Sequence, residues 1–513
     1  MKRDGSRISN WQESLPDYRP RNSGTDHRPA FDAIVVGGGI TGISTALELK
    51  RKGLKIMLAE ARNLGFGTTS GTTAHINSLL ETPYHQIEKD FGEKNAQLVA
   101  KATQEAMTLI RMNVEELGLD CDYRELAGFV YAQNEEQVTE LEKILASCQK
   151  YGLNASSNNT IPVNIPFTKA MLLEKQAQFH PVKYIYGLAA EFEKLGGVIL
   201  DNCRVTEVEE TSILEIKTTK GNFRATNLVY ATHIPPGVNL LHFRAAPYRS
   251  YAIAVKLRNE NDNPEGLVYD LQQPYHYFRT YIHKGETYMI VGGEDHKTGH
   301  DDHTEMHFAR LLSFLRGYYD VEELVHQWSS QYFNSSDGLA YIGHLPGHPQ
   351  NIYVATGFGG NGMPYSHIAA NVLSELIVAG DSEYRTVFDP NRIKPVAGFQ
   401  EFSKEAADVA GLLFKTILPK EKLAVLADMA RGEARIVNYE GEKLAIYKDE
   451  NGKIHALHPA CPHIKCTVAW NGAEKTWDCP CHGSRFNYDG ELLTGPARKG
   501  LEKVRIEKTA DQT

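Results

Sequence analysis

The chain has 513 residues, a formal net charge of −9 and 42% hydrophobic residues. The composition is typical of a soluble globular protein, and the length predicts about two to four domains. Outside a short N-terminal tail no Lys/Arg-rich stripe occurs, which excludes nucleic acid as an expected partner and favours small molecules or proteins. The sequence contains no run of about eighteen apolar residues, so we expect no membrane span. Residues 1–30 are expected to be an N-terminal extension, and they lack the apolar core of a signal peptide. We therefore expect a cytoplasmic location.

The first organised segment, residues 31–61, reads FDAIVVGGGITGISTALELKRKGLKIMLAEA. Its pattern predicts a buried strand, a glycine turn, an amphipathic helix and a second strand, which together form one βαβ unit. After it, residues 81–150 are expected to be mainly helical and residues 152–166 to form a polar loop. The sequence then predicts a helix from His180 and strands over 203–210, 213–219 and 227–233. Residues 245–335 are expected to form several strands and one helix. A second strand, glycine turn and helix follow over 351–380, and short strands begin at Arg431.

The glycine turn itself predicts a dinucleotide site. Gly37 permits the tight turn, Gly39 lets the backbone approach a pyrophosphate, and Gly42 allows close packing of helix on sheet. The N-terminus of the helix then faces the phosphate charge, and Glu60, at the end of the next strand, would accept hydrogen bonds from a ribose. The alternative is a βα turn that merely tolerates glycine.

Four stretches resemble the D-amino-acid oxidase/sarcosine oxidase/glycine oxidase superfamily of FAD oxidoreductases: VVGGGITG, LGFGTTSGTTAHI, RVTEV followed by LVYATH, and IYVATGFGGNGM. The resemblance covers about residues 31–389 and implies noncovalent FAD, since no cysteine stands where sarcosine oxidases attach their flavin. No second complete GxGxxG unit follows, which argues against a built-in NAD(P)H site. The FAD-binding residues that it implies are Gly37, Gly39, Ile40, Thr41, Gly42, Glu60, Ala61, Gly67, Thr68, Thr73, Ala74, His75, Val205, Ala231, Thr232, Gly357, Gly359, Gly360, Asn361, Gly362 and Met363.

The substrate side departs from that family. Glycine and D-amino-acid oxidases usually carry an arginine for the substrate carboxylate where this chain has Tyr332. Tyr251, Tyr277 and Arg279 are the substrate-side candidates, and Arg279 would grip an anion with its guanidinium fork. The alternative interpretation of Arg279 is that it is a surface residue on an edge strand. His75 is either a flavin neighbour or a loop residue, and no catalytic base is assigned.

The C-terminal cysteines and histidines predict a metal centre. Cys461-x-His463 and Cys479-x-x-His482 supply two thiolates and two imidazoles, a set that zinc would also accept in a tetrahedron. The sequence HGS offers the hydroxyl of Ser484 to a bridging sulfide, and the surrounding pattern is that of a small β domain. These features favour iron and sulfide.

The same segment closely resembles a Rieske domain over about residues 431–508. By that resemblance Cys461 and Cys479 bind one iron of a 2Fe-2S cluster, and His463 and His482 bind the other, which raises the potential to roughly −150 to +300 mV. Cys466 and Cys481 lie at matching offsets in the two loops, where a disulfide could join them. The histidine-bound iron is expected nearer the surface, as the exit for electrons, and GPARKGL resembles the proline loop that covers the cluster.

High-potential respiratory Rieske proteins carry a tyrosine where this chain has Phe486. The missing hydroxyl removes a hydrogen bond to a cysteine ligand, and fewer such bonds lower the potential. We therefore expect a potential below that of the respiratory members.

The expected fold is an α/β FAD-binding domain of Rossmann type interleaved with an α+β substrate domain and followed by an all-β Rieske domain. The expected boundaries are 1–30 for the N-terminal extension, 31–80, 181–240 and 337–390 for the FAD-binding domain, 81–180 and 241–336 for the substrate domain, 391–430 for a connector with one helix, and 431–513 for the Rieske domain.

Three functions agree with this organisation. The first is a dehydrogenase that oxidises a small amine or amino-acid-like substrate and passes electrons singly to an external acceptor protein. The second is a reductase in which a donor protein feeds the cluster and then FAD. The third is a redox sensor or partner-binding flavoprotein without turnover. A homo-oligomer is compatible with each of them.

Overall fold

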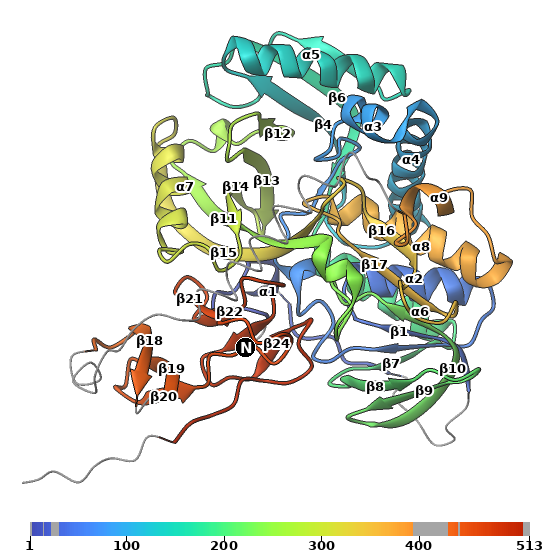
Figure 1. Cartoon of the computed structure of the whole chain (residues 1–513). Helices are drawn as coiled ribbons and strands as arrows, with labels where there is room; N and C mark the ends of the chain where they lie inside the picture. Colours follow the sequence, from blue (N-terminus) through green and yellow to red (C-terminus); the bar gives the residue numbers. More distant parts are fainter. Residues whose placement is uncertain (1–2, 14, 22–29, 393–428, 440–441, 506–513) are drawn as a thin grey trace, which may run out of the picture.

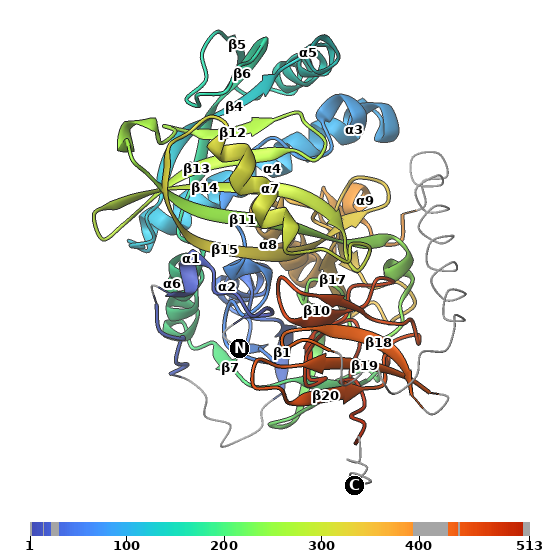
Figure 2. The same cartoon turned by 90° about the vertical axis from the view of Figure 1, so that its left-hand side faces the viewer.

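The computed structural model describes residues 3–13, 15–21, 30–392, 429–439 and 442–505. It contains a mixed sheet around the predicted βαβ unit, a second large sheet beside it, and two small C-terminal sheets (Figure 1). The helix expected in the connector lies outside the described residues. Figure 2 shows the C-terminal strands, in orange and red, against one flank of the two large sheets.

The first sheet is built on a parallel core in the order β17-β10-β1-β2-β7. Its central strands are apolar on both faces, as expected where helices cover a parallel sheet, and α2 packs against α6 and α8. The sheet comprises β1 (Phe31–Val36), β2 (Ile56–Ala59), β7 (Val198–Leu200), β8 (Val205–Glu209), β9 (Leu214–Thr218), β10 (Gly221–Tyr230), β16 (Tyr341–His344) and β17 (Ile352–Thr356), with helices α2 (Ile40–Arg51), α6 (Pro181–Lys194), α8 (Gly362–Ala379) and α9 (Arg385–Phe388).

The second sheet has the order β15-β11-β14-β13-β12-β4-β6-β3, with β5 paired to β6. Helix α7 packs against β11, β14 and β15, and α5 packs against β4, β5 and β6. The elements are β3 (His75–Ile76), β4 (Arg124–Ala132), β5 (Ala155–Asn158), β6 (Lys169–Gln178), β11 (Ala245–Leu257), β12 (Leu267–Asp270), β13 (His276–His283), β14 (Glu286–Lys297) and β15 (Val321–Ser335), with α3 (Tyr84–Phe91), α4 (Glu93–Glu116), α5 (Glu135–Lys150) and α7 (Met306–Arg316).

Strand β4 interrupts the region expected to be mainly helical. Its sequence RELAGFVYA ends in a buried apolar run, and such a run does not distinguish a strand from a buried helix by periodicity. Pairing decides the outcome, because β4 lies between β12 and β6 in the sheet. Strand β5 likewise forms inside the predicted loop by pairing with β6.

The C-terminal region folds into short antiparallel strands, as its Gly and Asn-Gly turns indicate. A three-stranded sheet is followed by a four-stranded one, both in chain order. Their strands are β18 (Ala434–Tyr439), β19 (Glu442–Lys448), β20 (Ile454–Leu457), β21 (Ala469–Asn471), β22 (Thr476–Asp478), β23 (Arg485–Asn487) and β24 (Leu492–Thr494). Within the described ranges, no helix is long and apolar enough to cross a membrane.

The N-terminal segment packs between the C-terminal region and the second sheet. Arg3 is 1% exposed and donates to both carboxylate oxygens of Glu474 at 3.1 Å. Glu474 also accepts from the backbone N–H of Ser329 on β15 at 2.9 Å. Asp4 accepts from Arg485 on β23 at 2.8 Å. Three distant parts of the chain therefore share one buried ionic cluster, which sequence patterns alone did not reveal.

The cluster is expected to hold the C-terminal domain in place. Burial alone would raise the pKa of Glu474, but the charges on Arg3, Arg249 and Arg485 more than offset this effect and lower the pKa to about 2. Because this pKa lies below the ordinary value of 4.5, the stabilisation is complete above about pH 4.5 and is lost as the pH falls toward 2.

Replacing Glu474 by glutamine leaves the arginines without their central counter-charge. We expect a loss of about 3–5 kcal/mol, because removal of one partner from a buried ion pair strands the other charge, measured as a lower urea midpoint for release of the C-terminal domain. The matched control is Lys475→Ala, which removes an exposed pair with Glu450 and costs less than about 1 kcal/mol. Equal urea midpoints for the two variants would contradict the role of the cluster.

Candidate functional site

A cavity of about 1050 Å³ lies where the first sheet, the second sheet and the C-terminal domain meet. Its lining begins at the turn after β1, continues through η1 (Thr68–Ser70), and reaches a group of tyrosines on the second sheet. Leu493, Thr494, Gly495 and Ala497 of the C-terminal domain form part of its wall. One space therefore touches all three parts of the chain.

The turn after β1 has the shape that a pyrophosphate requires. Gly37 has φ +113°, and a Cβ there would lie 2.4 Å from the carbonyl oxygen of Ala231. A Cβ on Gly42 would lie 1.8 Å from the carbonyl oxygen of Gly37, so the helix can approach the strand only without a side chain. Helix α2 starts at Ile40, and Ile40 and Thr41 of its first turn line the cavity, where the N-terminus of the helix would stabilise an anion.

The far end of this part of the cavity suits a nucleoside. Glu60 follows β2 and accepts from the backbone N–H groups of Gly38 at 2.6 Å and Arg62 at 2.7 Å, which aims the carboxylate into the turn. Burial raises the pKa of Glu60, although these two hydrogen bonds and the charge on Arg204 oppose the rise. Val205 lines the same end. A ribose hydroxyl would add a further hydrogen bond to this partly buried carboxyl group, which still has acceptor capacity.

Most residues expected around FAD line this one cavity. They are Gly37, Gly39, Ile40, Thr41, Glu60, Ala61, Gly67, Thr68, Thr73, His75, Val205, Ala231, Thr232, Gly359, Gly360, Asn361, Gly362 and Met363. Gly42 contacts the turn from behind, and Gly357 borders a smaller neighbouring cavity. Ala74 is fully buried beneath the loop. The donor pattern, the glycine cradle and the continuous space all fit FAD.

The three substrate-side candidates separate in the structure. Tyr277 lines the cavity, and its hydroxyl lies 3.0 Å from that of Ser250. Tyr251 is fully buried behind the cavity wall, where its ring stacks on His307 and its hydroxyl lies 2.9 Å from His296 Nε2. The structure therefore removes Tyr251 from the substrate side.

Arg279 is also directed away from the cavity. Its Nη1 donates to the carbonyl oxygens of Thr73 at 2.7 Å and Ala74 at 3.1 Å, and its guanidinium lies over the ring of Trp11. It is neither a substrate clamp nor a surface residue. It holds the loop that carries His75, including Ala74 at φ 57°, against the cavity.

The substrate end contains acidic residues that the sequence analysis did not select. Asp295 at the end of β14 accepts from the hydroxyl of Tyr332 at 2.7 Å, and Glu81 accepts from the hydroxyl of Tyr275 at 3.3 Å. A Cβ on Gly360 would lie 2.3 Å from Glu81 Oε1, so this group adjoins the turn expected to line the flavin ring. Neither acid belongs to a local motif, because β14, β15 and the segment after β3 meet only in the fold.

The four expected metal ligands meet at two loops of the C-terminal domain. Cys461 and Cys479 are both buried in the core of this domain, and the rings of His463 and His482 have centroids 4.9 Å apart. His463 Nδ1 and both ring nitrogens of His482 are buried and have no hydrogen-bond partner within the described residues. Two thiol sulfurs and two free imidazole nitrogens fit the mixed ligand set of a Rieske cluster.

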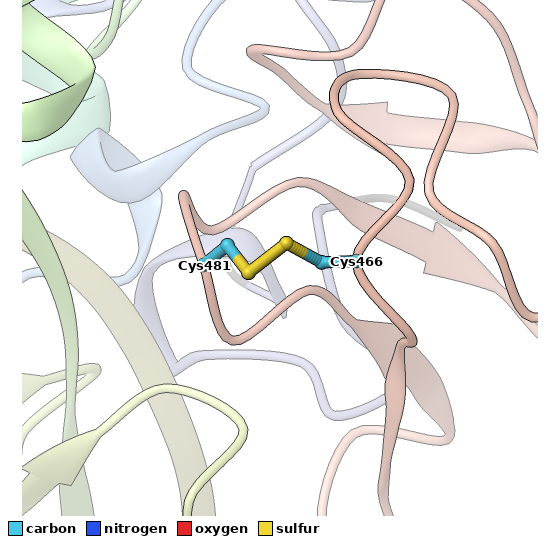
Figure 3. Close-up of a disulfide and its surroundings, with 2 residues drawn as sticks. All are labelled: Cys466 and Cys481. Carbon is cyan, nitrogen blue, oxygen red and sulfur yellow. A yellow bond between two sulfur atoms is a disulfide. The ribbon is translucent and has the colours of Figure 1, made fainter. Parts of the chain in front are cut away.

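Cys466 and Cys481 join the same two loops. Figure 3 shows their disulfide, which has a Cα–Cα distance of 6.5 Å. The backbone N–H of Cys461 also donates to the carbonyl oxygen of Cys466 at 2.8 Å. The disulfide therefore connects the loop of Cys461 and His463 to the loop of Cys479 and His482 and fixes their separation.

The histidine edge packs against the rest of the chain, although His463 remains partly exposed to solvent. His482 is 1% exposed, and its ring contacts His242 and Phe243 of η2 (Leu240–Phe243) at centroid distances of 5.8 and 5.5 Å. His463 Nε2 lies 3.0 Å from the carbonyl oxygen of Gly237. The expectation that this edge lies near the surface therefore fails for His482, because the domain docks with that histidine inward, whereas His463 is partly exposed.

The cluster loops also adjoin the cavity. The segment His233–Gly237 begins in the cavity lining with His233, Ile234 and Pro236 and ends at the contact with His463. On the other side, the backbone N–H of Ala497 donates to Ser484 Oγ at 3.0 Å while Ala497 borders the cavity. Only short stretches of chain separate the space for FAD from the two loops.

This combination of a dinucleotide cavity and a docked cysteine–histidine centre defines a flavoprotein with an iron–sulfur domain, and the comparisons agree. Residues 32–376 match the model of the family described as FAD dependent oxidoreductase, and residues 421–505 match the Rieske [2Fe-2S] domain. The chain belongs to this family of FAD dependent oxidoreductases and carries a Rieske domain. Its cofactors are FAD and a 2Fe-2S cluster, so zinc is not the metal of the C-terminal centre.

The relatives share all or part of this architecture. YhfW of Bacillus subtilis (strain 168), whose name describes a Rieske 2Fe-2S iron-sulfur protein, is 32% identical over 97% of both chains. Gamma-glutamylputrescine oxidoreductase of Escherichia coli (strain K12) is 25% identical over 69% of this chain and 84% of its own. The solved structure of glycine oxidase from Geobacillus kaustophilus shares the fold, with a TM-score of 0.59 and 17% identity over 71% of this chain and 99% of that one.

Phe486 permits a test of the expected low potential. The residue is fully buried on β23, opposite Trp477. Phe486→Tyr is expected to raise the midpoint potential of the cluster in a redox titration, because a hydroxyl near a cysteine ligand adds a hydrogen bond to sulfur. Tyr488→Phe, which removes a hydroxyl elsewhere in the domain, should leave the potential unchanged. An intact cluster with the same potential in Phe486→Tyr would contradict the expectation.

Proposed function

We propose that the protein is a cytoplasmic dehydrogenase that oxidises a C–N bond in a small amine or amino-acid-like substrate and passes the electrons singly to an external acceptor protein. The relatives named above include proteins described as a gamma-glutamylputrescine oxidoreductase and a glycine oxidase, which supports a substrate with a C–N bond. FAD supplies two-electron hydride chemistry and the cluster supplies one-electron transfer.

One observation carries the proposal. The histidine edge of the Rieske domain docks on the segment His233–Gly237, whose other end lines the FAD cavity. Gln331 of β15 adds a hydrogen bond from Nε2 to the carbonyl oxygen of Gly483, next to His482, at 2.9 Å. A domain that exchanged electrons only with outside proteins would gain nothing from burying this edge. The arrangement favours internal transfer over a flavin site and a cluster that act separately.

The residues around the cavity orient a substrate and exclude water. His75 holds its ring by a contact of 2.9 Å between Nδ1 and the hydroxyl of Tyr269, and burial, followed by the charge on Arg279, lowers its pKa well below 6.5. The imidazole is therefore neutral at pH 7 and does not repel a cationic amine. Its buried Nε2 has no partner in the described part of the chain and remains available to a bound group.

Anaerobic rapid mixing of the fully loaded protein with a panel of amines, amino acids and hydroxy acids tests the proposal. We expect at least one amine to bleach the flavin absorption first and to reduce the cluster afterwards. Cluster reduction by an external donor, followed by flavin reduction and with no bleaching by any compound, would favour a reductase. Absence of bleaching across the panel, with no flavin reduction from the cluster side, would favour a sensor.

A further inference from the structure

We propose that the substrate end of the cavity binds an alkyl diamine or polyamine, a molecule with positive charge at both ends and no carboxylate beside the reacting nitrogen. The inference rests on the proposed function and specifies its substrate class. The starting observation is the charge of the lining contributed by residues 81–140 and 248–332. Among the described residues this part contains no lysine or arginine, whereas it contains the carboxyl groups of Glu81, Glu136, Glu140, Asp270 and Asp295.

The inner charge site is formed by Asp295 and Glu81. Asp295 Oδ2 accepts from Tyr332, whereas the buried Oδ1 has no hydrogen-bond partner among the described residues. Burial raises the pKa of Glu81, and the negative charge of the nearby Asp295 raises this pKa further. A buried carboxylate oxygen that accepts no hydrogen bond is costly, and an ammonium group would supply both the missing charge and the missing donor.

Tyrosine rings surround this inner site. Tyr248 and Tyr332 stack with centroids 5.9 Å apart, and Tyr275 and Tyr277 lie 5.6 Å apart. All four line the cavity. Aromatic faces attract alkylammonium groups, so acid and aromatic groups together favour a cation over a neutral or anionic ligand.

A carboxylate beside the reacting nitrogen would find no counter-charge here. The position expected to carry the carboxylate-binding arginine holds Tyr332, which donates to Asp295. Arg279 is occupied by backbone carbonyl oxygens of the His75 loop. An amino acid would therefore place its anionic group against Glu81 or Asp295, where like charges repel.

The outer end of the same lining supplies a second acidic site. Glu136 and Glu140 are four residues apart in α5 and so lie on one face of the helix. Glu140 Oε1 lies 3.1 Å from His85 Nε2, and its Oε2 accepts from the exposed Lys143 Nζ at 3.3 Å, so Glu136 is the outer acid with the less compensated charge. Asp270, by contrast, already pairs with His276 at 2.8 Å. Inner and outer carboxylates at different places of one cavity match two separated positive charges.

The acidic groups also predict a pH dependence of binding. Burial raises the pKa of Glu81 to about 7 and that of Asp295 to about 6. Burial raises the pKa values of the facing Tyr275, Tyr277 and Tyr332 as well, so these rings stay neutral. Since a cation binds the deprotonated acids, affinity should increase as the pH rises from about 6 to about 8.

The test is isothermal titration of the loaded protein, reduced beforehand with dithionite so that no turnover occurs. The probes are 1,4-diaminobutane, butylamine, glycine and sarcosine. We expect 1,4-diaminobutane to bind roughly tenfold or more tightly than the others, and Asp295→Asn or Glu81→Gln to weaken it by roughly tenfold or more. The matched control is Glu294→Gln, since Glu294 is the neighbour of Asp295 but contacts His307 and lies outside the lining.

Equal binding of glycine and 1,4-diaminobutane, or unchanged affinity in Asp295→Asn, would overturn the inference. Mixing the oxidised protein with the same compounds separates this failure from that of the proposed function. If an amino acid bleaches the flavin and the diamine does not, the substrate class is wrong and the proposed function stands. If the diamine binds as expected but no amine bleaches the flavin, the proposed function fails and the binding site stands.

Discussion

Replacing His482 by alanine is expected to abolish electron delivery to an external one-electron acceptor while leaving substrate oxidation by the flavin intact. The histidine contacts His242 and Phe243, and its two buried ring nitrogens have no hydrogen-bond partner in the part of the chain that the structure describes. Loss of a residue that hydrogen-bonds to a metal ligand already lowers metal affinity or activity by about 10–100-fold. Loss of the ligand itself should therefore have a larger effect. The measurements are the visible and EPR spectra of the cluster, anaerobic flavin bleaching, and turnover with ferricyanide or a cytochrome as acceptor.

The matched control for this variant is His455→Ala. His455 is a buried histidine of the same domain, but it pairs with Asp449 and Asp489 and does not face the cluster loops. We expect this variant to keep the cluster spectrum and turnover. A His482→Ala protein with an unchanged cluster spectrum would contradict the assigned ligand set, and one that loses the cluster but keeps full turnover would contradict the electron route.

Gly42→Val is expected to yield protein without FAD. Any side chain at this position collides with the turn, because a Cβ would lie 1.8 Å from the carbonyl oxygen of Gly37. The clash is with a backbone atom, which cannot move aside as the end of a flexible side chain can. The helix must therefore shift away from the strand, and the N–H groups at its start no longer point toward the phosphates of FAD. The flavin-to-protein ratio of the purified protein measures the effect, and we expect it to fall close to zero.

Gly53→Asn is the matched control at the other end of the same helix. Gly53 has φ +88°, and no atom of the described residues would lie within 4 Å of a Cβ at this position. Asparagine is the non-glycine residue that best tolerates this backbone region. Its flavin content should remain that of the native chain. Retention of full FAD by Gly42→Val would show that the close packing of helix on strand does not support the site.

The sequence predicted the parts of the fold that local patterns encode. The glycine turn after β1 and the strand-helix pair of β17 and α8 appear where expected, because each carries its own turn chemistry. Strand β4 and the buried Arg3 could not be predicted in the same way. Residues 124–132 form a strand because they pair with β6 and β12 in the folded sheet. Arg3 is buried because it pairs with Glu474, which lies 471 residues away in the sequence.

The candidate site shows the same division. Cys461 and His463, with their counterparts in the second loop, form a spaced motif, and they meet in the structure. The orientation of the histidine edge depends on how the domain docks, which no spacing encodes, and the expectation of a surface position failed for His482 for that reason. Asp295 could not be predicted because it is a single acidic residue at the end of a strand and belongs to no motif. Only its tertiary contact with Tyr332 indicates that it belongs to the candidate site.

Internal electron transfer is the central claim, and the concentration dependence of cluster reduction tests it most directly. The oxidised, fully loaded protein is mixed anaerobically with a reducing substrate, and the EPR signal of the reduced cluster is followed after rapid freezing at several protein concentrations. Transfer inside one chain, through the contact of His463 with Gly237, predicts a first-order rate that is the same at every concentration. A rate proportional to protein concentration would mean that electrons travel between molecules and would contradict the account.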